Sequence, residues 1–140
     1  MPVASSAQLN REYRRAQVAA ARPTQLTVML YDGAIRFLSL ARERMLAGDL
    51  EGRHAYMLKG QSIVAALLGA LDMERGGDVA ANLQRLYLYM YEMLVEANLM
   101  DKPGPIEQVV AMLADLRESW AELDAREAEG SVPDASVHAA

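Results

Sequence analysis

Apolar side chains recur every three or four positions along four stretches of the chain, which is the spacing of one face of an α-helix. The stretches cover residues 24–47, 50–72, 79–100 and 105–123. In the third stretch, steps of four and three alternate as in a heptad repeat, through Val79, Leu83, Leu86, Met90, Met93, Ala97 and Met100. We therefore predict four helices of roughly 20 residues, each about 30 Å long.

The breaks between these stretches are short and carry residues that end or start helices. Gly48 fits a helix stop, and Asp49 fits the N-cap of the next helix. Residues 75–78 form the second break, with Asp78 as a cap, and Pro105 suits the first position of the last helix. Short connections between amphipathic helices of equal length favour antiparallel neighbours. The pattern predicts an all-α fold, an antiparallel four-helix bundle over residues 23–127.

The two ends of the chain fall outside this pattern. We predict a short N-terminal arm at residues 1–22, whose larger apolar residues are Leu9, Tyr13 and Val18. These three residues can form a short amphipathic turn but cannot fill the face of a stable helix alone. Residues 128–140 are small and polar and contain Gly130 and Pro133, which predicts a disordered C-terminal tail.

Charge is distributed unevenly around a net value of −5. Residues 1–22 carry four arginines against one glutamate, a net +3, whereas residues 92–140 carry eleven acids against three bases, a net −8. The basic arm could lie on the acidic body, or both could be solvated ends. Because the compact part is acidic, we expect no binding of nucleic acid.

The sequence lacks the residues and segments that several classes of protein require. The chain has no cysteine, so it has no disulfide or thiolate metal site, which suits a reducing cytoplasm. No apolar stretch reaches the roughly 18 residues of a membrane span. Residues 1–10 lack the basic start and apolar run of a secretory signal. We expect a cytoplasmic protein without membrane insertion.

Catalytic and metal-binding constellations are also missing. Glu51 and His54 form one Glu-x-x-His motif, but a di-iron bundle needs two such motifs and two further carboxylates. The other histidine, His138, lacks the preceding glutamate. There is no glycine-rich phosphate loop. We expect no metal, no cofactor and no enzymatic activity.

One predicted helix carries more apolar surface than a bundle needs. Residues 86–95 contain a single charge, at Glu92, and a second stripe runs beside the heptad positions through Tyr87, Tyr91, Leu94 and Asn98. A bundle helix needs only about three apolar positions in seven. Either two neighbouring helices and loops cover the tyrosines, or the stripe forms a groove that accepts an apolar segment of a partner.

Sequence motifs in a fixed order resemble the flagellin export chaperone family called FliS. They are Leu30-Tyr31-Asp32-Gly33-Ala34, Leu71-Asp72 with Gly76-Gly77, Asn82-Leu83 with Leu86-Tyr87, Glu96-Ala97-Asn98-Leu99, and Leu116-Arg117 with Trp120. Tyr13 and Val18, placed before Pro23, resemble the N-terminal segment of that family. The resemblance spans residues 9–124.

This resemblance implies an antiparallel four-helix bundle that binds the C-terminal segment of newly made flagellin. Such a chaperone prevents premature polymerisation and delivers flagellin to the flagellar export apparatus, with the export gate as a further candidate partner. By position, the binding residues would be Tyr13, Val18, Ile63, Leu67, Leu71, Tyr87, Tyr91, Leu94 and Asn98. Tyr13 would belong to a movable segment that can lie over part of the bundle.

Some details depart from the family, and one alternative function stays open. The family commonly has Ser-Pro where this chain has Arg22-Pro23, which removes an N-cap, so Thr24 would start the helix instead. The alternative is a structural bundle that uses the same surface to self-associate, without a chaperone role. We expect a monomer or a weak homodimer.

Overall fold

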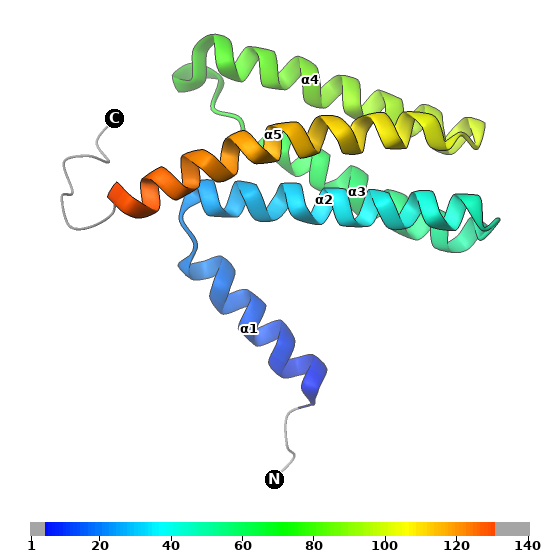
Figure 1. Cartoon of the computed structure of the whole chain (residues 1–140), viewed down its shortest axis with the longest axis horizontal. Coiled ribbons are helices and arrows are strands. Elements are labelled where there is room, and N and C mark those ends of the chain that lie inside the picture. Colours follow the sequence, from blue (N-terminus) through cyan, green and yellow to red (C-terminus); the bar gives the residue numbers. More distant parts are fainter. Residues whose placement is uncertain (1–4, 131–140) are drawn as a thin grey trace.

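The computed structural model describes residues 5–130 of the chain (Figure 1). Its helices are α1 Ser6–Ala20, α2 Pro23–Leu46, α3 Leu50–Gly69, α4 Met73–Met100 and α5 Pro103–Gly130. No strand occurs within this part of the chain. The predicted all-α class is therefore confirmed, with five helices where four were expected.

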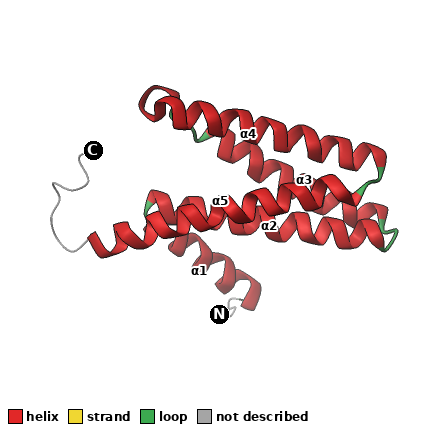
Figure 2. Cartoon of the chain, turned by 45° about the horizontal axis from the view of Figure 1, so that its top comes forward, coloured by secondary structure: helices red, strands yellow, loops and turns green. Residues whose placement is uncertain are grey.

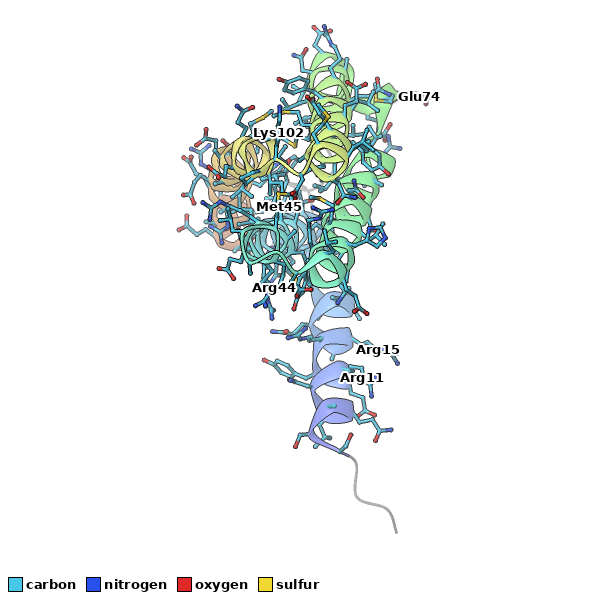
Figure 3. The ribbon with its side chains drawn as sticks, turned by 90° about the vertical axis from the view of Figure 1, so that its right-hand side faces the viewer. Arg11, Arg15, Arg44, Met45, Glu74 and Lys102 are labelled. Atoms are coloured by element: carbon cyan, nitrogen blue, oxygen red, sulfur yellow. The ribbon has the colours of Figure 1, made fainter. Side chains whose placement is uncertain are left out.

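Four of the helices pack into one body, and α1 stands apart. α2 packs on α3 and α5, and α4 completes the body by packing on the same two helices. We call α2 to α5 the helical body. α1 leaves it at the end where α2 begins and buries none of its residues (Figures 1 and 3). Figures 1 and 2 both show the first part of α4 diverging from α5.

The core of the body draws its buried side chains from all four helices. Its largest fully buried members are Tyr31, Leu38, Met57, Val64, Tyr87, Met90, Leu94, Ile106, Val109 and Leu113. The heptad positions of α4 are only partly buried, because Val79 is 67% exposed and Met100 is 53% exposed at the two ends of that series. α2 and α3 approach closely at Gly60, where a Cβ atom would lie 2.4 Å from Leu38 Cδ2.

The predicted turn residues act mostly as expected. Gly48 has a positive φ of 74°, and the Asp49 side chain accepts a hydrogen bond of 2.9 Å from the Gly52 amide. The second break is a kink inside α4, where Gly77 has φ 52° and ψ −130°. Asp78 as the N-cap was wrong, since Asp72 takes that place, accepting from the Arg75 amide at 3.1 Å.

The last helix is longer than predicted at both ends. α5 begins at Pro103 instead of Pro105. The N–H group of the first helical residue has no partner within the helix, so proline, which lacks this group, suits that position. The helix continues to Gly130, so residues 128–130 of the predicted tail belong to it. Ala125, Ala128 and Glu129 are strong helix formers that extend it. The rest of the predicted tail, residues 131–140, lies outside the described residues.

The N-terminal arm is a full helix instead of a short turn. A reciprocal capping box starts α1, in which Ser5 Oγ accepts from the Gln8 amide at 3.1 Å and Gln8 Oε1 accepts from the Ser5 amide. The prediction weighed only the scarce apolar residues, whereas alanine, arginine and glutamine favour helix by propensity. Thr24 as an N-cap was also wrong, because α2 starts at Pro23 without a side-chain cap.

Candidate functional site

A row of large apolar side chains lies exposed along α4. Leu88, Tyr91, Val95 and Leu99 are 45%, 39%, 44% and 82% exposed. Their spacing of three, four and four residues places them on one face of the helix. We call these four residues the α4 stripe. Monomers rarely leave a contiguous apolar patch of this kind open to water unless it binds something.

α3, which packs on α4, also exposes a large apolar side chain. Leu58 of α3 is 49% exposed. The contacts of α3 with α2 run through Tyr56, Gly60 and Ile63, so Leu58 points away from α2.

Polar groups lie at the C-terminal end of α4, next to the last residues of the α4 stripe. Arg53 of α3 pairs with Asp101, which caps the end of α4 in a left-handed conformation. One turn earlier, the Asn98 Oδ1 atom is buried without a hydrogen-bond partner, as is Arg53 Nε. A buried donor or acceptor without a hydrogen-bond partner costs free energy. A small change in the side-chain conformations that gives Arg53 Nε and Asn98 Oδ1 a partner would therefore be favourable.

Three of the predicted binding residues, Leu67, Tyr87 and Leu94, lie in the core instead of on the surface. Tyr87 is 1% exposed and Leu94 is fully buried, so the predicted stripe is not open as a whole. The hydroxyl groups of Tyr87 and Tyr31 share a hydrogen bond of 2.5 Å. Burial raises the pKa of both tyrosines. Of the two interpretations offered for the tyrosines, coverage by neighbouring helices holds for Tyr87.

The other predicted binding residues of the body are spread over several environments. Ile63 is half-buried against Gly33 of α2. On α4, Tyr91 is exposed and Asn98 is half-buried.

The prediction missed three exposed residues of the α4 stripe, namely Leu88, Val95 and Leu99. Their i, i+7, i+11 spacing was visible in the sequence. With apolar residues almost all round this helix, however, periodicity could not separate the face that is buried from the face that is open.

A second apolar feature lies where α4 and α5 diverge. Two adjoining hollows of about 310 and 230 Å³ are both lined by Val79, Leu83 and Trp120. Leu71, at the end of the α3–α4 connection, closes the first hollow, whereas Leu116 and Leu123 of α5 line the second. We call this feature the Trp120 cleft. It includes Leu71 from the predicted site.

The two predicted residues of the arm do not share a face. Tyr13 is 64% exposed and Val18 is 45% exposed on α1. They are five positions apart, so their side chains point about 140° apart around the helix. α1 does not contribute to the α4 stripe in this structure, because it extends away from the helical body (Figure 3).

The described residues contain no group of three or more acidic, histidine or cysteine side chains that could hold a metal ion. His54 is exposed on α3. Within residues 5–130, no helix is long and apolar enough to cross a membrane. The chemistry that the arrangement supports is the burial of apolar side chains of a partner.

Comparison with known proteins points in the same direction. A family model described as "Flagellar protein FliS" matches residues 5–127. The flagellar secretion chaperone FliS of Bacillus subtilis is 32% identical over 108 residues, which cover 77% of this chain and 80% of the relative. The flagellar secretion chaperone FliS of Salmonella typhimurium is 37% identical over 107 residues, covering 76% and 79%. FliSB of Pseudomonas aeruginosa is 37% identical over 105 residues, covering 75% and 83%.

Proposed function

This chain belongs to the FliS family of flagellar proteins, and from that premise we propose that it is a cytoplasmic chaperone for the C-terminal segment of flagellin. In this role it keeps flagellin from polymerising early and delivers it to the export apparatus. The relatives named above are called flagellar secretion chaperones, which supports the proposal. The export gate stays a predicted second partner.

The observation that carries the proposal is the α4 stripe. A disordered segment loses conformational freedom when it binds, so it must bury a large apolar area, of order 1,000–3,000 Å². The stripe presents apolar side chains at helical spacing over three turns, which is the pattern that a bound helix or extended segment can follow. Helices α2 to α5 would serve as the predicted antiparallel four-helix bundle around which the segment wraps.

The predicted binding residues take different parts in this proposal. Tyr91 contacts the flagellin segment directly, together with the other members of the α4 stripe. Asn98 is half-buried on α4 and stays a predicted contact. Tyr87 and Leu94 hold the stripe from beneath through core packing. The two arm residues, Tyr13 and Val18, stay predictions, since α1 lies elsewhere.

The test is a calorimetric titration of this protein with the C-terminal segment of flagellin from the same source. The Leu88→Ala/Tyr91→Ala variant should weaken binding by roughly tenfold or more and reduce the negative heat-capacity change, because it removes exposed apolar area. Tyr89→Ala is the matched control. Tyr89 is also on α4 and is 52% exposed. It lies two positions before Tyr91, so its side chain points away from the α4 stripe.

Each result has a definite consequence. Weaker binding for the double variant and unchanged binding for Tyr89→Ala would support the α4 stripe as the binding surface. Equal binding by all three proteins would be consistent with the proposed chaperone function but would show that the α4 stripe is not the binding surface. If the unmodified protein does not bind the segment at all, the proposed function is wrong.

A further inference from the structure

One side of helix α1 carries positive charges that no other part of the described structure neutralises. Arg11, Arg14 and Arg15 are exposed, and their side chains form no ion pair or hydrogen bond within residues 5–130. By the 3.6-residue period, the three arginines fall within an arc of roughly 100° around the helix. Figure 3 shows the side chains of Arg11 and Arg15 on the same side of α1. We call these three arginines the basic face.

The larger apolar residues of α1 divide between the two sides of the helix. Leu9 and Tyr13 lie roughly 150–170° around the helix from the middle of the basic face. Val18 falls inside the arc of the arginines and is 45% exposed. Glu12, the one acid of α1, lies outside this arc, roughly 110° from its middle. The basic face is thus a compact strip of positive charge with one small apolar side chain in it.

The arm and the rest of the chain carry opposite charge. α1 has a net charge of +2, whereas residues 23–140 have a net charge of −8. Where α1 leaves the helical body, Arg22 takes up Asp124 in an ion pair of 3.0 Å. α1 extends away from the body (Figures 1 and 3), and Arg11 lies about 14 Å from Ala20 at the end of α1. Because charges are screened over about 8 Å at physiological salt, a negative surface attracts the outer part of the basic face with little repulsion from the body.

The residues of the basic face favour a lipid surface over a folded protein or a nucleic acid. Protein partners are usually held by a large anchor residue packed into a pocket at the centre of the interface, whereas the basic face has only Val18 there. Sites for single-stranded nucleic acid stack bases on aromatic rings, but the ring of Tyr13 belongs to the opposite side of α1. Anionic lipids present phosphate groups over a plane, and arginines bind these groups without a matching shape.

We propose that the basic face of α1 binds the surface of membranes that contain anionic lipids. The arginines pair with lipid phosphates, Val18 lies against the headgroups, and the acidic helical body stays on the aqueous side. Each basic residue close to an anionic surface strengthens binding by a factor of roughly five, so three of them give a weak and reversible attachment. The α4 stripe takes no part in this contact, so the proposal does not depend on the binding of flagellin.

The test is sedimentation of the full chain with lipid vesicles, without flagellin, at low salt and increasing lipid concentration. Vesicles of equal parts phosphatidylglycerol and phosphatidylcholine should bind the protein, whereas vesicles of phosphatidylcholine alone, which have no net charge, should not. Added salt should weaken the binding by screening the arginines from the lipids. The Arg11→Gln/Arg14→Gln/Arg15→Gln variant should bind the charged vesicles roughly tenfold or more weakly. Glutamine favours helix about as well as arginine, so α1 should stay formed in this variant.

A matched control separates the basic face from the net charge of the protein. Arg36→Gln/Arg85→Gln/Lys102→Gln removes three positive charges outside α1. The three residues are exposed and form no ion pair within the described part of the chain. This control has the same net charge as the variant of the basic face, yet it should bind the charged vesicles like the unmodified protein. Leu9→Ala/Tyr13→Ala should also bind them unchanged, because it alters the opposite side of α1.

Four outcomes would overturn the proposal. The first is that the unmodified protein does not bind the charged vesicles at low salt, or binds charged and neutral vesicles equally. The second is an equal loss of binding in the two triple variants, which would trace the effect to net charge alone. The third is a loss of binding in Leu9→Ala/Tyr13→Ala but not in the variant of the basic face, which would show that the apolar side of α1 meets the lipid. The fourth is tighter binding of a single-stranded DNA oligonucleotide than of the vesicles through the same arginines, which would assign the basic face to nucleic acid.

Discussion

At the scale of residues, the most informative feature is the polar contact inside the core. Tyr31 of α2 and Tyr87 of α4 are both buried, and their hydroxyl groups bond each other. Buried hydroxyl groups cost free energy unless they are paired, so the two residues depend on one another. Trp120 packs against the same core and also lines the cleft, so the cleft rests on the buried core of the helical body.

Alkaline pH should destabilise the protein through these tyrosines. Burial raises the pKa of Tyr31 and Tyr87 above the ordinary value of 10.0. Above pH 10 the unfolded chain releases protons that the folded chain retains, so the stability present below pH 10 is lost as pH rises. Each group should contribute up to about 1.4 kcal/mol per pH unit.

Urea unfolding between roughly pH 8 and pH 11 measures this effect through the free energy of unfolding. The Tyr31→Phe/Tyr87→Phe variant should show a clearly shallower decline with pH than the unmodified protein. Tyr89→Phe serves as the control, because it removes the hydroxyl group of a tyrosine that is half-exposed instead of buried. An equal decline in all three proteins would contradict the assignment.

At the scale of elements, α2 packs extensively on α3 and α5, whereas α4 packs less extensively on the same two helices. Three ion pairs link α2 to α5 at intervals along their length: Arg22–Asp124, Asp32–Arg117 and Arg42–Glu107. The residue numbers rise on α2 and fall on α5, as in antiparallel helices. No ion pair joins α4 to α5 among residues 5–130, and the first turn of α4 is set off by the kink at Gly77. The Trp120 cleft lies at this end of α4, between α4 and α5.

The kink should depend on glycine at position 77. Its backbone lies at φ 52° and ψ −130°, where other residues are strained, although a Cβ atom added there would have no other atom within 4 Å. We expect Gly77→Ala to lower the free energy of unfolding by about 1–3 kcal/mol through backbone strain alone.

Gly69→Ala provides the matched comparison for this substitution. Gly69 ends α3, has no positive φ and also has no atom near a Cβ position. Alanine there should raise the free energy of unfolding by about 0.4–1 kcal/mol, because it restricts the unfolded chain. Opposite signs for the two variants in urea unfolding would support the strained kink. Equal effects would show that position 77 tolerates alanine.

At the scale of the whole molecule, stability should fall from α2 outward. α2 packs on two helices and contributes six buried residues, whereas α1 contributes none. Amides in regions with few buried contacts exchange through local opening. In native-state hydrogen exchange of the dilute protein, we expect α1 to exchange first and the middle of α2 last. Slow exchange throughout α1 at high dilution would contradict this order.

Much of the fold followed from local patterns in the sequence. Periodic apolar positions identified four helices, and Gly48 and Asp49 marked the first turn. The glycines at 76–77 marked a kink inside α4, whereas the connection from α3 lies earlier, at residues 70–72. These features depend on neighbours within a few residues, so a single sequence contains them. α1 was underestimated because its helix depends on propensity and a capping box more than on apolar spacing. The family was also readable, since its motifs are local and ordered.

The location of the exposed apolar surface depended on the tertiary structure. In α4 the sequence offers apolar residues on nearly every side, so the spacing of Tyr87, Tyr91 and Leu94 was compatible with either an open or a covered face. The rotation of α4 about its axis determines which face is covered. It buries Tyr87 and Leu94 and leaves the α4 stripe exposed to solvent. Burial depends on which helices become neighbours, a property of contacts between residues far apart in the chain. The sequence by itself thus determined the helices and the family, whereas only the packing of those helices decided which apolar residues face water.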